Sequence, residues 1–204
     1  MSDKSPGVFS YYADGSFIIG IKNRTSTDEI IGLSRVEVSS EGESSIFSPA
    51  APIAVSLVSG IDITQAHGTS ASWVDFAAFD ENGNLQDIKY TSSIGGSSWR
   101  IDYFSPPSER IFQFSPAICR SRFSDTYPIH LVATADNLLW ISVEGSSGFS
   151  PWQQISDTEV FSSPDCDVSE NGAVNVVVRT IGGAILHVSG KDSTFSETEL
   201  GASQ

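Results

Sequence analysis

Apolar and polar residues alternate over short segments along most of the chain, and this pattern predicts β-strands. Residues 129–133 and 174–179 are typical, because each is a short segment of mainly β-branched or aliphatic residues bounded by turn residues. No segment combines helical apolar spacing with a capping residue before it, and the longest ambiguous stretch, residues 27–38, is interrupted by Gly32. The pattern therefore predicts an all-β protein.

Apolar strands run into tight turns several times along the chain. The turns are rich in Asp, Asn or Gly, and they lie at residues 80–84, 136–137, 182–183 and 14–15. Gly and Asn adopt the positive φ angles that short hairpin turns require. Each turn therefore predicts a pair of neighbouring antiparallel strands.

Two further features recur between these turns. A Phe-Ser-Pro sequence, with an extra Ser in one copy, precedes an apolar strand at residues 47–49, 114–116 and 161–164. An aromatic residue opens the last strand of each unit, and 14 positions separate Leu85 from Trp99 and also Leu138 from Trp152. Repeated units of about fifty residues with four strands are typical of β-propeller blades.

We therefore predict a single β-propeller domain over residues 1–204, with about four blades that are each a four-stranded antiparallel sheet. The blades are expected at about residues 6–45, 46–110, 112–157 and 160–200. The first blade is expected to be incomplete and to lack its innermost strand. Residues 199–204 would supply that strand, or the ring would stay imperfect, or subunits of a homo-oligomer would complete one another. A β-sandwich with irregular repeats is the alternative fold.

Composition limits the partners. The 204 residues include 11 basic and 25 acidic side chains, which gives a formal net charge of −14. A field of this sign repels phosphate backbones and anionic lipids, so we expect neither nucleic acid nor a membrane as partner. The first six residues contain no apolar segment of a secretory signal, and we therefore expect a cytoplasmic location.

The sequence offers little metal or catalytic chemistry. His67, His130 and His187 are single and widely spaced, and no paired Cys motif is present, so we expect no metal and no cofactor. Cys119 and Cys166 follow the Ser-Pro sequences at similar positions. Inner strands favour small side chains, so we expect both cysteines to be buried, unpaired thiols.

Several of the repeated segments resemble known lectins. Residues 76–90, FAAFDENGNLQDIKY, followed by Trp99, resemble a blade of the fungal fucose-specific lectins. Residues 136–140, 150–152 and 161–164 resemble related bacterial β-propeller lectins, with the sequences DNLLW, SPW and FSSP. The resemblance covers about residues 46–200, and it implies a propeller that binds sugars in pockets between its blades.

The resemblance also suggests site residues. In those lectins an Arg, a carboxylate or amide, and a Trp hold the sugar. The carboxylate position matches Asp87 and the Trp position matches Trp99, but no Arg stands at the Arg position, so the full triad is not retained. We expect a pocket beside the second blade, with Asp87 and Arg100 as polar contacts and Trp99 as the stacking wall. Trp99 and Arg100 are adjacent on a strand and point to opposite faces, and Trp99 is the favoured of the two.

The second choice of site is the incomplete first blade, around Tyr11, Tyr12 and Arg35. Trp152 is expected to seal one blade against the next rather than to bind a ligand.

The favoured function is a lectin-like propeller that binds a carbohydrate or another small molecule without catalysis. One alternative is a propeller recruited as a biosynthetic enzyme, such as a cyclase, with one deep apolar pocket lined by unequal blades. Another is a protein-interaction propeller, which would show a broad apolar patch without a pocket.

Overall fold

The chain folds into β-strands and turns in every part that the computed structural model describes. These parts are residues 9–11, 17–24, 29–38, 44–47, 53–55, 57, 59, 62–67, 71–93, 96–107, 110–121 and 128–202. They contain no helix, which confirms the all-β prediction, and hence no helix that could cross a membrane.

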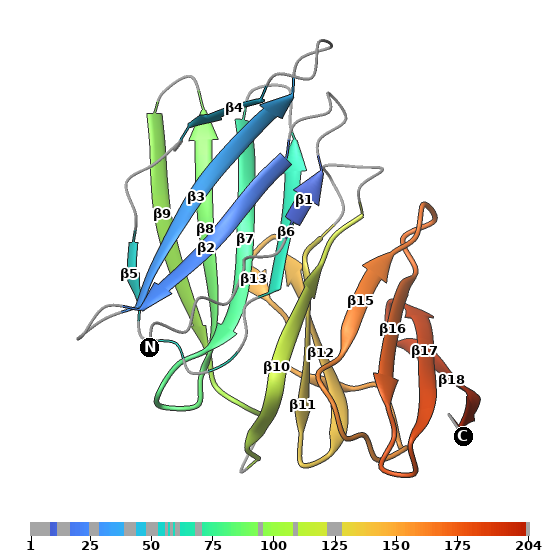
Figure 1. Cartoon of the computed structure of the whole chain (residues 1–204). Helices are drawn as coiled ribbons and strands as arrows, with labels where there is room; N and C mark the ends of the chain where they lie inside the picture. The colour runs from blue at the N-terminus through green and yellow to red at the C-terminus, as the bar shows by residue number, and fades with distance from the viewer. Residues whose placement is uncertain are drawn as a thin grey trace.

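The strands form four antiparallel sheets that follow one another in chain order (Figure 1). The first sheet contains β1 (Phe9–Tyr11), β2 (Phe17–Arg24), β3 (Glu29–Val38) and β4 (Ser44–Phe47), with β5 (Ile53–Val55) paired to β3. The second sheet contains β6 (Asp62–His67), β7 (Ala71–Phe79), β8 (Leu85–Ser93) and β9 (Gly96–Phe104).

The third sheet contains β10 (Phe112–Cys119), β11 (His130–Ala135), β12 (Leu138–Gly145) and β13 (Gly148–Phe149), with β14 (Gln153–Gln154) paired to β12. The fourth contains β15 (Asp165–Val168), β16 (Val174–Arg179), β17 (Ala184–Lys191) and β18 (Thr194–Ala202).

The central turn of each of the last three sheets has the chemistry that the sequence predicts. Asp80 Oδ1 accepts hydrogen bonds from the N–H groups of Asn82 and Asn84 at 2.9 and 2.8 Å, and Gly83 has a φ of 78°. Asp136 and Asn137 have positive φ in the third sheet, as Gly183 has in the fourth. Side-chain hydrogen bonds and left-handed residues therefore close these hairpins.

The expectation that the first blade lacks a strand is wrong. β1 pairs with β2, and β1 to β4 follow one another across the first sheet. The sequence predicts the central turn of this blade at residues 14–15, but β1 and β2, which flank that position, are the first and second strands of the sheet. Asp14-Gly15 itself lies outside the described residues, and the pairing of β5 with β3 adds residues 53–55 to the first sheet.

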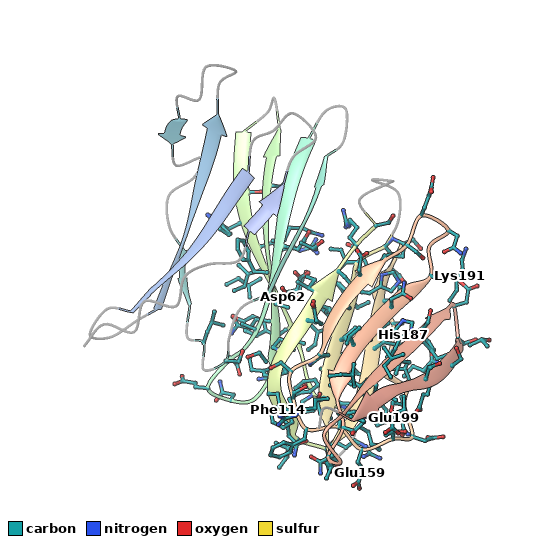
Figure 2. All side chains as sticks on the ribbon, turned by 45° about the vertical axis from the view of Figure 1, so that its right-hand side comes forward. Asp62, Phe114, Glu159, His187, Lys191 and Glu199 are labelled. Carbon is teal, nitrogen blue, oxygen red and sulfur yellow. A yellow bond between two sulfur atoms is a disulfide. The ribbon has the colours of Figure 1, made fainter. Side chains whose placement is uncertain are left out.

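The first strands of successive sheets lie beside one another. β1 lies next to β6, β6 next to β10, and β10 next to β15. Figures 1 and 2 show the first and fourth sheets at opposite ends of this series, so the described strands do not close a ring.

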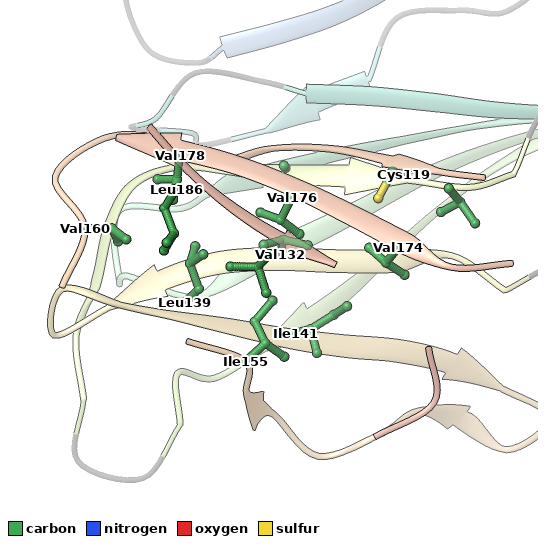
Figure 3. Close-up of a cluster of buried hydrophobic side chains, with 13 residues drawn as sticks. Cys119, Val132, Leu139, Ile141, Ile155, Val160, Val174, Val176, Val178 and Leu186 are labelled. Atoms are coloured by element: carbon green, nitrogen blue, oxygen red, sulfur yellow. The ribbon is translucent and has the colours of Figure 1, made fainter. Parts of the chain in front are cut away.

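The last three sheets pack through their faces. The third and fourth sheets enclose a cluster of buried aliphatic side chains, among them Val132, Leu139, Ile141, Val176 and Leu186 (Figure 3). A second cluster, which includes Phe79, Leu85, Phe112 and Leu131, joins the second sheet to the third. Burial of this apolar surface is what holds the sheets against one another.

The prediction of two free thiols is wrong. Cys119, at the end of β10, forms a disulfide with Cys166 of β15, and their Cα atoms are 5.8 Å apart. The two cysteines occupy similar positions on first strands, and the structure places these strands side by side, so the two positions meet. A cytoplasmic location stays a prediction.

Candidate functional site

The face of the second sheet that packs on the third carries a row of charged side chains. In the strand register, Asp75 lies opposite Lys89, and Asp87 lies opposite Ala77, with Asp102 on its other side. Alternate residues of a strand point to one face, and Ala77 belongs to the cluster between these sheets. The charged residues therefore point toward the third sheet.

One end of this boundary is apolar and is closed by Trp152. Its indole Nε1–H donates a hydrogen bond to the carbonyl oxygen of Ser105, which follows β9, at 2.9 Å. The ring also packs edge-on against Phe112, with centroids 5.3 Å apart. Trp152 thus ties the third sheet to the second, in the sealing role that the sequence analysis expects.

The other end of the boundary is held by ion pairs around Glu144, near the end of β12. Lys89 Nζ lies 3.2 Å from Asp75 Oδ1 and 3.2 Å from Glu144 Oε1, so it bridges a carboxylate of each sheet. Arg120 Nη2 lies 3.0 Å from Glu144 Oε2, which also accepts the N–H of Ile129 at 3.3 Å. Two cations and a backbone amide therefore fix the Glu144 carboxylate.

The buried acids of this cluster have unusual protonation equilibria. Asp75 and Asp87 are both 0% exposed. Burial raises the pKa of Asp75 to about 6, against the opposing effects of Lys89 and Arg120. Burial, and then the negative charge of Asp75, raise the pKa of Asp87 to about 8. At neutral pH, Asp87 is therefore mainly protonated.

Glu144 and Lys89 of the cluster keep their charges. Burial alone would raise the pKa of Glu144, but the charges of Lys89 and Arg120 outweigh it and hold this pKa below its usual value. Burial alone would lower the pKa of Lys89, but the carboxylates of Asp75 and Glu144 hold it above its usual value. Glu144 is thus a carboxylate, and Lys89 a cation, at neutral pH.

Glu144 also lines a groove of about 550 Å³ at the outer end of the same boundary. The groove lies between β9 and the β12–β13 hairpin, and its wall consists of Arg100, Asp102, Tyr103, Phe104 and residues 144–149.

The groove has a charged and an aromatic part. Arg100 Nη2 lies 2.6 Å from Asp102 Oδ2, and both side chains are partly exposed. Phe149 packs edge-on against Phe104 with ring centroids 4.8 Å apart. Tyr103 follows Asp102 on β9, so its ring points to the other face of the sheet, as that of Trp99 does. Charged hydrogen-bonding groups therefore stand beside the half-buried rings of Phe104 and Phe149.

The structure brings two of the three first-choice residues to this region. Arg100 lines the groove, and Asp87 points to the same boundary from a fully buried position behind it. Trp99 points to the other face of the sheet, where its ring lies 6.3 Å from that of Phe76, and it does not line the groove. A ligand-binding role for these residues stays a prediction.

The second-choice residues cannot be placed in the same way. Tyr11 and Arg35 belong to β1 and β3, but their side chains, like the whole of Tyr12, lie outside what the structure describes.

Sequence reasoning missed Glu144, Asp102, Lys89 and Arg120 as members of the site. Glu144 is 55 positions from Lys89, and no local pattern links them. One signal was present, however: Asp75, Asp87 and Lys89 occupy alternate, inward-facing positions of strands whose other inward residues are apolar. Charges at such positions are rarely buried without a partner, so they indicate an ion-pair cluster.

The described residues also bear on metal binding and on the histidines. That part of the chain contains no group of three or more His, Cys, Asp or Glu side chains arranged to hold a metal ion. His130 is buried, and burial lowers its pKa to about 4, so its ring is neutral at neutral pH.

Comparison with known proteins shows similarity of fold. No protein-family model matches the chain, and no curated protein matches its sequence. The fucose-specific lectin from Aleuria aurantia matches with a TM-score of 0.61 and 12% identity, over 92% of this chain and 56% of that chain. This chain therefore matches little more than half the length of that lectin.

Other solved structures are similar to this chain as well. The GH43_1 enzyme from Xanthomonas citri, complexed with xylotriose, matches with a TM-score of 0.52 and 10% identity, over 95% of this chain and 72% of that chain. AofleA from Arthrobotrys oligospora gives a TM-score of 0.51 and 10% identity, over 95% of this chain and 68% of that chain. Lectins and GH43 enzymes of the β-propeller class thus share this arrangement of sheets, and identities this low show fold alone.

Proposed function

We propose that the chain is a lectin-like β-propeller, in which each of the four sheets is a blade, and that it binds a carbohydrate without catalysis. The proposed site is the groove between the second and third sheets. The observation that carries the proposal is the combination of Arg100, Asp102 and Glu144 with the aromatic rings of Phe104 and Phe149 around one groove.

This combination suits the chemistry of a sugar. Carboxylate oxygens accept hydrogen bonds from adjacent sugar hydroxyls, and a guanidinium donates to sugar oxygens through charge-assisted bonds. The C–H faces of a sugar ring pack on aromatic rings, as Phe104 and Phe149 would allow. The Glu144 carboxylate is already fixed by Lys89 and Arg120, so a ligand would lose little affinity in ordering it.

A contrast within the molecule supports a role beyond packing for the charged cluster. On its other face, β12 presents Leu139, Ile141 and Val143 to the fourth sheet, and all three pack in an apolar cluster. Two sheets of this protein can therefore pack without buried charge, and replacing buried ion pairs by apolar residues often costs no stability. Similarity of fold to a fucose-specific lectin is in accord with the proposal.

The proposal is tested by a glycan array, followed by calorimetric titration of the parent with the glycan that gives the strongest signal. We expect saturable binding with no product formed from the glycan. Arg100→Ala should weaken the affinity at least tenfold, because the variant loses charge-assisted hydrogen bonds of about 1.5–3 kcal/mol. Arg179→Ala removes an exposed arginine of the fourth sheet and should leave affinity unchanged. Equal affinities of the parent and Arg100→Ala would refute this site, and an empty array would refute the function.

A further inference from the structure

Lys89 is shared between two carboxylates, only one of which reaches the groove. Its Nζ contacts Asp75 inside the second sheet and Glu144 at the groove, at 3.2 Å in each case. Asp87 lies two residues before Lys89 on β8 and points to the same face. Neither carboxyl oxygen of Asp87 has a hydrogen-bond partner within the described part of the chain. A buried acid without partners thus stands beside the cation that holds a groove residue.

We propose that Asp87, through the proton it carries, controls how Lys89 holds Glu144 at the groove. When Asp87 is neutral, Lys89 has two carboxylates to satisfy and keeps Glu144 in place. When Asp87 ionises, Lys89 moves toward the new charge and Glu144 loses one of its two cations. We expect ligand affinity to fall at alkaline pH as a result, and this consequence rests on the proposed function.

The charges around Asp87 support this coupling. Across the strands of its own sheet, Asp75 and Lys89 lie on β7 and β8, Arg100 and Asp102 on β9, and Asp62 on β6 beyond Ala77. From the third sheet come Arg120, after β10, and Glu144 of β12.

Several of these charges are already engaged. Asp102 is paired with Arg100 at 2.6 Å, and Asp62, labelled in Figure 2, accepts the N–H of Ile118 at 2.8 Å. The carboxylates of Asp75 and Glu144 and the cations of Lys89 and Arg120 remain, and these four charges balance while Asp87 is protonated.

The charge balance determines how the ionisation of Asp87 acts on Glu144. Ionisation of Asp87 adds a third carboxylate to two cations in a cluster where Asp75 and Asp87 are fully buried. Like charges in such a site repel strongly because the effective dielectric constant is low. Glu144 is the carboxylate that can relieve the repulsion, since it alone of the three borders the groove. The pKa of about 8 for Asp87 places this change just above neutral pH.

The test follows carboxyl carbons by NMR in the full chain without any ligand, so it is independent of sugar binding. In the parent, we expect the Asp87 carboxyl carbon to titrate near pH 8 and the Glu144 carboxyl carbon to show a second inflection at the same pH. Asp87→Asn should remove the second inflection of Glu144. Asp165→Asn, which removes an exposed carboxylate of β15, should keep it.

Two results would overturn the inference. One is an Asp87 carboxyl carbon that titrates near pH 4, and the other is a Glu144 signal without an inflection where Asp87 ionises. Either result would leave the proposed carbohydrate site standing, because that site is tested by binding.

Discussion

Glu144 of the third sheet accepts a hydrogen bond from Lys89 of the second sheet, with Nζ and Oε1 3.2 Å apart. The pair connects the inside of the boundary between two sheets with the groove at its outer end. Lys89 is mostly buried, whereas Glu144 borders the groove. Packing between the sheets and the geometry of the candidate site therefore depend on the same two side chains.

The variant Trp99→Ala tests which face of the second sheet carries the binding site. The sequence favours Trp99 as the stacking residue, but its ring packs near Phe76 on the face away from the groove. We expect Trp99→Ala to lower stability by about 2 kcal/mol through lost packing and to bind the array-selected glycan like the parent. Chemical denaturation and calorimetry measure the two effects. A folded Trp99→Ala variant without glycan affinity would move the site to the other face of the second sheet.

The sequence predicts the strands and turns well because these depend on neighbouring residues. The Asp80 turn is one example, since its Asn and Gly residues carry the hydrogen bonds and positive φ that close it. The alternation of side chains along a strand also predicts correctly that Trp99 and Arg100 point to opposite faces of the sheet. It does not predict which of the two faces borders a groove.

Contacts between sheets were not predictable in the same way. The Cys119–Cys166 disulfide joins residues 47 positions apart, and the Lys89–Glu144 pair joins residues 55 positions apart. Both depend on how one sheet is placed against the next, which local patterns do not encode.

Trp152→Ala should loosen the boundary between the second and third sheets. The variant loses packing on Phe112 and the hydrogen bond to Ser105, and we expect a loss of about 2–3 kcal/mol in the free energy of unfolding. Urea denaturation measures it. Leu200→Ala, at a side chain that is 60% exposed, is the control and should change stability by less than about 0.5 kcal/mol. Equal stabilities of the two variants would show that Trp152 does not seal the boundary.

The disulfide should make stability depend on reductant. It closes a loop with a sequence separation of 47, for which chain entropy gives a stabilisation of about 4 kcal/mol. We expect denatured, unreduced protein to contain no titratable thiol, and urea denaturation to show lower stability after reduction. The double variant Cys119→Ser, Cys166→Ser should be as unstable as the reduced parent and insensitive to reductant. Two free thiols in the unreduced parent would contradict the pairing.

Stability should also fall as pH rises through the range in which the buried acids ionise. The pKa values of Asp75 and Asp87 in the folded chain, about 6 and about 8, exceed the ordinary value of 3.8. The folded state therefore binds more protons than the unfolded state between these limits, and by linkage the free energy of unfolding decreases toward pH 8.

Asp87→Asn keeps the neutral form at every pH and should reduce this slope. We subtract the free energy of unfolding of the parent from that of the variant at each pH. This difference should increase by more than about 1.4 kcal/mol from pH 5 to pH 9, the equivalent of one pKa unit. Urea denaturation at several pH values measures the slope, with Asp165→Asn as the exposed control. Parallel profiles for Asp87→Asn and the parent would show that Asp87 is not a buried acid with a raised pKa.

The most direct test of the central claim locates a bound sugar on the protein. Backbone amide NMR shifts are recorded while the array-selected glycan is titrated into the parent. We predict saturable shifts concentrated in residues 100–104 and 144–149, which form the groove, and no comparable shifts in β16 and β17. Saturable shifts confined to other strands, or no shifts with any glycan on the array, would contradict a carbohydrate site in this groove.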